Sequence, residues 1–165
     1  MRFFYKMAVV LPVFLIFSGF PASRAAICLA QDSASPAGWE KGGEYDRHYD
    51  ASELDDLKGA IEEISEVTPL PGMAPGVGLI VRDQDGDSVK IHLGPKGFVK
   101  LEAAGIKKGD KVKVKGAWTE FDGKEIFMAS KVKKGENIEL KVRRTKDGTP
   151  FWSLSAEELA KEKEQ

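Results

Sequence analysis

Apolar and charged residues alternate with a period of two along much of this chain. The clearest stretch is Lys111–Trp118, in which Val112 and Val114 alternate with lysines. Lys124–Val132 repeats the pattern, and Asp122-Gly123 between the two runs suits a tight two-residue turn. A period of two predicts strands with one apolar and one charged face. We therefore predict a β-hairpin here and place it at the centre of the fold.

The same alternation predicts further strands on both sides of this hairpin. Val77–Asp83 and Asp87–Leu93 form a second predicted hairpin around Asp85-Gly86. Asn137–Arg144 is a predicted strand with Arg143 facing outward, and Asp147-Gly148 is expected to turn it back into Thr149–Ser153. These segments make the chain mainly β.

The segment Leu57–Val67 fits the period of a helix as well as the period of a strand. Leu57, Ile61 and Ile64 suit one side of a helix, and the content of alanine and glutamate favours a helix. Gly59 and the breaker at residues 68–72 favour a long strand instead. We predict a strand, because the later elements need a first strand to close the sheet.

Two short helices are predicted. Pro95 suits a first helical position and Gly105 a helix stop, which predicts a helix between the third and fourth strands. Ser155 and Glu158 have the spacing of a capping box, which predicts a final short helix. The whole pattern indicates a small OB-like Greek-key barrel of roughly five to six strands.

The first 30 residues have the layout of a secretory signal peptide. Arg2 and Lys6 precede Met7–Phe20, an apolar run shorter than the ~20 residues that a membrane span needs. Cleavage after Ala25 or Ala30 fits the small residues there, and we favour Ala30. We expect an exported, periplasmic chain without a transmembrane helix once mature, with an uncleaved anchor as the alternative.

The rest of the chain divides into three predicted parts. Residues 31–55 are a linker or N-terminal arm, residues 56–153 the barrel domain, and residues 154–165 a short charged helix or tail. Trp39, Tyr45, His48 and Tyr49 are unusually aromatic for a linker. A solvated tether and an arm packed on the barrel are both consistent with them.

Charge is divided unevenly along the chain. Residues 31–95 hold 14 acidic and 5 basic side chains, whereas residues 96–146 hold 7 acidic and 15 basic ones. Such a split suits the steering of a charged partner. The alternative interpretation is that lysines on outward strand positions merely block edge pairing.

Few residues offer catalytic or metal chemistry. The single cysteine, Cys28, falls in the predicted leader, and His48 and His92 are far apart in sequence. The chain has no nucleophile elbow, phosphate-binding loop or zinc-binding helix motif. We therefore expect no catalytic activity, no cofactor and no metal site. The alternation predicts that His92 points away from the core, beside Lys90.

Nucleic acid is a disfavoured ligand. Binders of single strands combine lysines with exposed aromatic residues for base stacking. On the lysine-bearing strands only Phe127 is predicted to face outward, whereas Trp118 falls in the apolar register. Export from the cytoplasm also argues against a nucleic-acid ligand.

Four segments resemble one family: VKIHLGPKGFV, GDKVKVKG, FDGKEIFMASKVKKGE and DGTPFWS. They are similar to the exported OB-like domain at the C-terminus of the magnetosome proteins MamS and MamX, over roughly residues 57–153. The residues characteristic of that domain correspond to His92, Gly94-Pro95 and Trp152 here. The resemblance implies a turn at Gly94-Pro95 and a tryptophan that plugs one end of the barrel. The haem-binding motif of MamX-like proteins is missing, so no redox role is implied.

Three hypotheses follow. The first is an exported, non-enzymatic module that binds a protein partner in an envelope or redox-related assembly. The second is binding of a polyanion or oligonucleotide by the lysine rows, and the third is a metal or haem accessory protein that uses His92. The candidate binding residues are Lys90, His92, Lys111, Lys113, Lys115, Lys131, Lys133 and Trp152.

Overall fold

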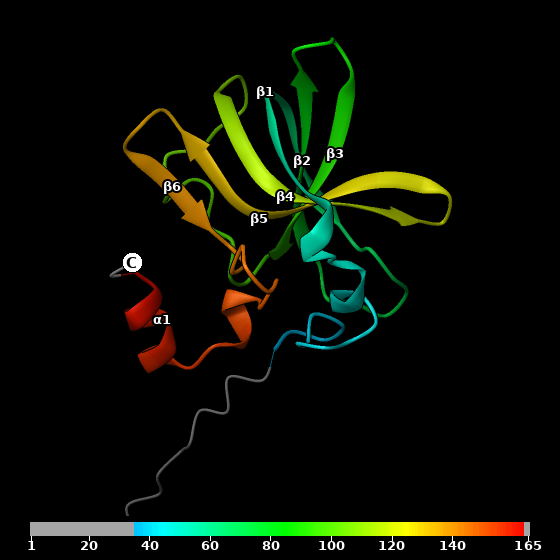
Figure 1. Ribbon diagram of the computed structural model, residues 1–165, viewed down its shortest axis with the longest axis vertical. Helices are drawn as coiled ribbons and strands as arrows, with labels where there is room; N and C mark the ends of the chain where they lie inside the picture. The colour runs from blue at the N-terminus through cyan, green and yellow to red at the C-terminus, as the bar shows by residue number, and fades with distance from the viewer. Residues whose placement is uncertain (1–34, 164–165) are drawn as a thin grey trace, which may run out of the picture. The chain divides into compact units, whose positions relative to one another are not determined.

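The computed structural model describes residues 35–163, so the predicted leader and its cleavage points lie outside the described residues. Within this range the chain forms six strands and one α-helix (Figure 1). The strands are β1 (Leu54–Val67), β2 (Gly76–Asp83), β3 (Ser88–Pro95), β4 (Lys111–Phe121), β5 (Lys124–Lys134) and β6 (Ile138–Lys141), and the helix is α1 (Ala156–Lys163). Three single-turn 3₁₀ helices are η1 (Asp46–His48), η2 (Ala51–Glu53) and η3 (Phe151–Ser153).

All six strands belong to one sheet, in the order β3-β2-β1-β4-β5-β6, and neighbours in this order are antiparallel. β3 also pairs with β5 in parallel, with Ile91 opposite Phe127 and His92 opposite Met128. The sheet therefore curls until its third strand meets its fifth. The prediction of a mainly β chain is confirmed, and Leu57–Val67 is a strand and not a helix.

The two predicted hairpins are present. β2 and β3 turn at Asp85-Gly86, and β4 and β5 turn at Asp122-Gly123. Asp122 has φ 49° and Gly123 φ 69°, the pair of positive angles that a two-residue turn of this type requires. Ser155 and Glu158 also form the predicted capping box, with hydrogen bonds of 2.8 and 3.3 Å between backbone N–H and side-chain oxygen atoms.

The prediction of a helix between the third and fourth strands is wrong. Residues 96–105 form successive turns, in which Val99 N–H donates to Pro95 O and Ala104 N–H to Lys100 O without a continuous ladder between them. A single helical turn is costly to nucleate, and Gly97 adds backbone entropy within it. The segment still buries Val99 and Leu101, although the helix is absent.

The predicted final strand is also mostly absent. Of Thr149–Ser153, only Pro150 bridges back, to Arg143, and Phe151–Ser153 is η3. Gly148 has φ 71°, in keeping with the predicted turn before it. Pro150 has no N–H to donate to a ladder, which limits this return to one bridge.

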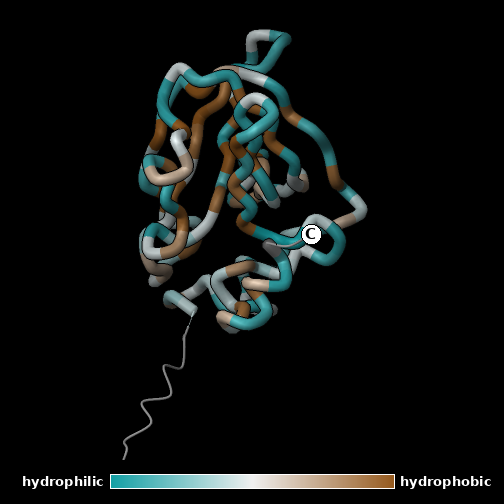
Figure 2. Tube along the Cα trace, turned by 90° about the vertical axis from the view of Figure 1, so that its left-hand side faces the viewer, coloured by the Kyte–Doolittle hydropathy of each residue, from teal (hydrophilic) through white to brown (hydrophobic). Residues whose placement is uncertain are grey.

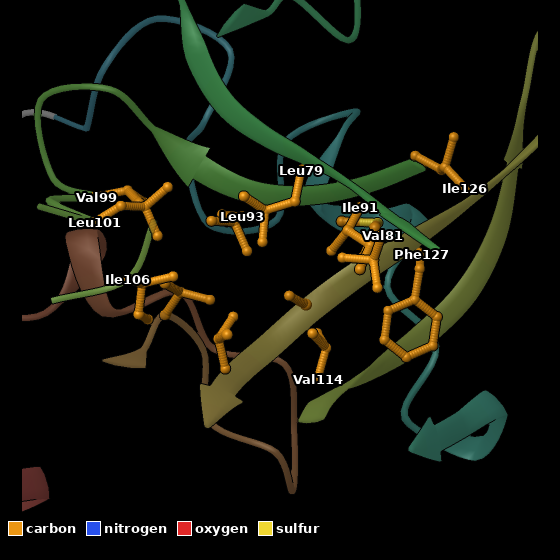
Figure 3. Close-up of a cluster of buried hydrophobic side chains, with 14 of the residues drawn as sticks. Leu79, Val81, Ile91, Leu93, Val99, Leu101, Ile106, Val114, Ile126 and Phe127 are labelled. Carbon is orange, nitrogen blue, oxygen red and sulfur yellow. The ribbon is translucent and has the colours of Figure 1, made fainter. Parts of the chain in front are cut away.

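The core lies inside the curled sheet. Figure 2 shows the hydrophobic positions gathered along the strands, with hydrophilic positions at the connecting loops. Figure 3 shows Leu79, Val81 and Ile91 packed between β2, β3 and β5, while Val99, Leu101 and Ile106 fill the end nearest Leu93. The turn segment after β3 therefore closes one end of the core.

A shift of register between β4 and β5 changes the predicted position of one aromatic residue, Phe127. The shift lies between Lys115 and Gly116, where Ser130 of β5 is the extra residue, and beyond it Phe127 is fully buried. Trp118 is half-buried opposite Phe127 and packs against the core, in keeping with its predicted apolar register. A Cβ on Gly116 would lie 2.2 Å from Met128 O, so only glycine permits this close strand approach. Phe127 is therefore a core residue and not an outward stacking surface.

Residues 35–53, the N-terminal arm, pack on the sheet. Trp39 is 1% exposed and Tyr45 is 2% exposed. The Trp39 indole N–H donates to Ala74 O at 2.8 Å, and the Trp39 ring meets Tyr45 edge to face at 4.7 Å. Trp39 and Tyr45 therefore belong to the core, and Tyr49 packs against it. No helix within residues 35–163 is long and apolar enough to cross a bilayer.

Trp39→Ala is expected to lower the free energy of unfolding by about 3–5 kcal/mol, because it removes a fully buried ring and its hydrogen bond. Urea denaturation followed by circular dichroism measures this change. Ile64→Ala is the control, since Ile64 is 39% exposed, and a loss below about 1 kcal/mol is expected there. Equal losses for the two variants would contradict a structural role of the arm.

Candidate functional site

His92 lies on β3 opposite the core side, yet it is only 6% exposed. The prediction that it points away from Ile91 and Leu93 fits the strand alternation, but the prediction of a surface residue is wrong. Tyr45 of the N-terminal arm covers it, with the hydroxyl 3.3 Å from His92 Nδ1, and Phe121 packs beside both rings. The arm comes from a distant part of the chain, so the local pattern does not reveal this cover.

Burial changes the protonation of this pair. Burial, with a smaller effect of Lys90, lowers the pKa of His92 from 6.5 to about 4. Burial likewise raises the pKa of Tyr45 above its ordinary value. Near neutral pH both groups are therefore uncharged and hydrogen-bonded to each other.

His92 reaches the wall of an open hollow that we call the histidine cleft, with a volume of about 490 Å³. Its other walls are Glu66 near the end of β1, Thr68 just after β1, Lys90, and the hairpin tip from Phe121 to Glu125. Acidic and basic groups are mixed there. Within residues 35–163 no three His, Cys, Asp or Glu side chains gather as metal ligands. Lys90 belongs to this cleft and is separate from the other predicted lysines.

Trp152 is buried where the N-terminal arm meets the C-terminal segment. Its indole N–H donates to Trp39 O at 2.7 Å, and the two indole rings meet edge to face at 5.7 Å. A Cβ on Gly94 would lie 2.5 Å from the Trp152 ring, which explains why glycine stands there. In the described structure the contacts of Trp152 are those of a packing residue.

Arg143 was predicted to face outward, and this is wrong, because its side chain is 3% exposed. β6 ends at Lys141, and both Val142 N–H and Arg143 N–H donate to Ser130 O, so the alternation stops before Arg143. The guanidinium pairs with Asp46 of the arm and lies 4.9 Å from the centre of the Trp152 ring. Asp46 is 97 residues away in sequence, so no local signal predicts this pair.

The lysines of the central strands gather on one outer surface. We call this surface the lysine face, and it carries Lys58, Lys111, Lys113, Lys115, Lys131, Lys133 and Lys141. Lysines stand directly opposite each other across β1, β4, β5 and β6: Lys58 with Lys113, Lys113 with Lys133, Lys115 with Lys131, and Lys131 with Lys141. Lys58 was not predicted as a binding residue, because only the register of the strands adds it to this surface.

Two carboxylates lie among these lysines. Asp56 bridges Lys113 and Lys115 at 3.0 and 3.4 Å, and Glu139 bridges Lys133 and Lys141 at 2.6 and 3.8 Å. The hydrogen bond from Lys113, with a smaller contribution from Lys115, lowers the pKa of Asp56 below its ordinary value. The basic charge of the lysine face therefore exceeds its acidic charge.

Four of these lysines enclose a shallow hollow. Lys113, Lys115, Lys131 and Lys133 line it together with Asp56, and its volume is about 180 Å³. Chemically, this arrangement offers converging ammonium groups to an anion. Five of the predicted lysines are thus brought together by the structure.

The pH dependence of stability tests the burial of His92. Its folded pKa, about 4, lies below the unfolded value of 6.5, so the unfolded chain binds more protons between these values. We expect wild type to lose about 3 kcal/mol relative to His92→Gln as the pH falls from 7 to 4. Urea denaturation at several pH values measures this, with His48→Gln as the control. Parallel pH profiles for wild type and His92→Gln would show that His92 titrates normally.

A protein-family model matches this chain. The model of the MamS/MamX magnetosome protein family matches residues 53–139, which is just over half of the chain. The match runs from the start of β1 into β6 and includes His92 and most of the lysine face. Among curated proteins no match is found. The chain therefore belongs to the MamS/MamX magnetosome protein family.

Proposed function

We propose that this chain is an exported accessory protein that acts by binding and not by catalysis. Its partner is a protein of the cell envelope that presents an acidic surface to the lysine face. The single observation that carries this proposal is the row of like-charged lysine pairs across β1, β4, β5 and β6, with Asp56 and Glu139 as the carboxylates that bridge them. The leader-like first 30 residues support export.

The lysine pairs are not explained by protection of a sheet edge. Lysines blunt edge strands, where unpaired backbone groups invite aggregation. β4, however, pairs with β1 on one side and β5 on the other. Lys113 and Lys115 therefore sit on an interior strand, where opposed like charges lower stability without protecting any edge. An acidic partner removes this repulsion.

The carboxylates of the chain itself indicate how a partner would bind. Asp56 and Glu139 each bridge two ammonium groups within 4 Å. Among the described residues, Lys58, Lys111 and Lys131 form no such ion pair. A partner's carboxylates would complete the same pattern on these three lysines. Electrostatic complementarity of this kind mainly increases the association rate and the specificity.

The proposed architecture that presents this face is an OB-like Greek-key barrel. The additional pairing of β3 with β5 links five strands into a closed circuit and supports this interpretation. A closed sheet is a rigid support for outward side chains, which then bind with little loss of backbone entropy.

Reversal of charge on the lysine face is expected to abolish partner capture. The variant is Lys113→Glu/Lys131→Glu/Lys133→Glu, and the measurement is cross-linking and pull-down of the tagged chain in envelope extract, compared with wild type at low and high salt. A matched control reverses three exposed lysines elsewhere, Lys41, Lys108 and Lys124. If both variants lost partner capture equally, or if neither lost it, the proposed binding surface would be contradicted. Thermal unfolding confirms that each variant is folded.

Binding of a polyanion is the second candidate, because the four-lysine hollow suits densely spaced anionic groups. Salt-dependent retention of the wild-type chain on heparin is then expected, and Lys111→Glu/Lys113→Glu/Lys115→Glu should elute at clearly lower salt. An absence of retention at low salt would remove the polyanion and leave the protein partner.

A further inference from the structure

A second candidate binding surface lies beside β6. It is a groove between β6, the turn segment 96–105, η3 and α1, and its volume is about 510 Å³. Its apolar lining is Phe98, Leu140, Phe151 and Leu159, and its charged lining is Lys100, Lys141 and Glu139, the last of which pairs with Lys133 and Lys141. We call it the α1 groove, and Figure 1 shows α1 beside the end of β6.

α1 occupies this groove incompletely. Among the described side chains of α1, Leu159 alone lines it, and most of the others are exposed. The open volume that remains is large enough for a bulkier side chain than leucine. An eight-residue helix has little stability of its own, so these few contacts determine whether α1 stays docked.

The other attachments of α1 are polar. Glu162 pairs with Arg144, and Lys141 Nζ lies 3.5 Å from Glu162 O. Partly exposed ion pairs of this kind contribute at most about 1 kcal/mol. One leucine and one partly exposed pair therefore hold the helix, which makes it easy to displace.

The charges of the groove and the helix are complementary. α1 carries three glutamates and two lysines, and Glu162 is the carboxylate that pairs with a basic residue outside the helix, Arg144. Beside the α1 groove, a second hollow of about 410 Å³ is lined by Lys131, Lys141, Arg144 and Lys146. The carboxylate of Glu162 thus lies among basic residues, next to the apolar lining of the α1 groove.

We infer that the α1 groove is a docking site for an acidic amphipathic helix of a partner protein, and that α1 is its internal occupant, displaced when the partner binds. α1 itself shows the chemistry that fits: one apolar anchor directed at Phe98, Leu140 and Phe151, and a carboxylate directed at Arg144. A partner helix with a larger anchor fills the volume that Leu159 leaves open. Recognition of a helix by its spaced apolar anchors is a common binding mode.

This inference does not rest on the lysine face. The α1 groove shares Lys141 with that face, so one acidic partner is able to contact both. The apolar floor, however, lies on different residues and is tested separately. Failure of the charge-reversal experiment would leave the groove unaffected.

The test uses the full chain with α1 released. Leu159→Asp/Glu162→Lys removes the anchor and the ion pair, and Glu157→Lys is the control, because Glu157 is exposed and its salt bridge is to Lys161 of the same helix. The probe is a synthetic peptide of residues 155–165 with tryptophan in place of Leu159. A second peptide carries aspartate at that position.

Titrations followed by amide NMR detect even weak binding. The tryptophan peptide should shift the amides of Phe98, Leu140 and Phe151 in the released variant, at a peptide concentration on the order of tenfold lower than in wild type or Glu157→Lys. Excess peptide should also speed hydrogen exchange of α1 in wild type, a measurement that stands if the released variant is poorly folded. Equal binding to all three chains, shifts with the aspartate peptide, or unchanged exchange of α1 would overturn the inference.

Discussion

The contact on which the rest of this structure depends joins the two ends of the described chain. Trp152 donates its indole N–H to the carbonyl of Trp39, 113 residues earlier, and both rings are buried against each other. The backbone of Gly94 lies directly under Trp152, at the point where β3 ends. Because this contact brings the N-terminal arm, β3 and the C-terminal segment together, its loss would uncover one whole side of the sheet.

The arm that this contact holds decides which surfaces are available for binding. Tyr45 and Asp46 follow Trp39 closely, and they cover His92 and pair with Arg143. A buried ion pair is seldom a large net source of stability, yet breaking it is costly, so the Arg143–Asp46 pair mainly fixes the position of the arm. His92 is thereby reduced to one wall of a mixed-charge cleft. The lysine face, on the outer side of β1, β4, β5 and β6, stays open.

The lysine face and the α1 groove have one physical property in common. Each holds an acidic group of the chain itself against basic residues: Asp56 and Glu139 among the lysines, and Glu162 beside Arg144. Each leaves further binding capacity unused, in unpaired ammonium groups or in open apolar volume. An acidic protein with an amphipathic helix would satisfy both, which fits the proposed accessory role.

The sequence by itself determined the strands, their turns and the helix cap, because these depend on neighbours in the chain. The valine–lysine alternation predicted β4, Asp122-Gly123 predicted its turn, and Ser155 with Glu158 predicted the start of α1. Only the tertiary structure decided the burial of His92 and Arg143, the inward position of Phe127 and the addition of Lys58 to the lysine face. Each of these depends on a distant partner or on the register between strands. An alternating pattern predicts that a strand has two faces, but it does not predict what covers each face.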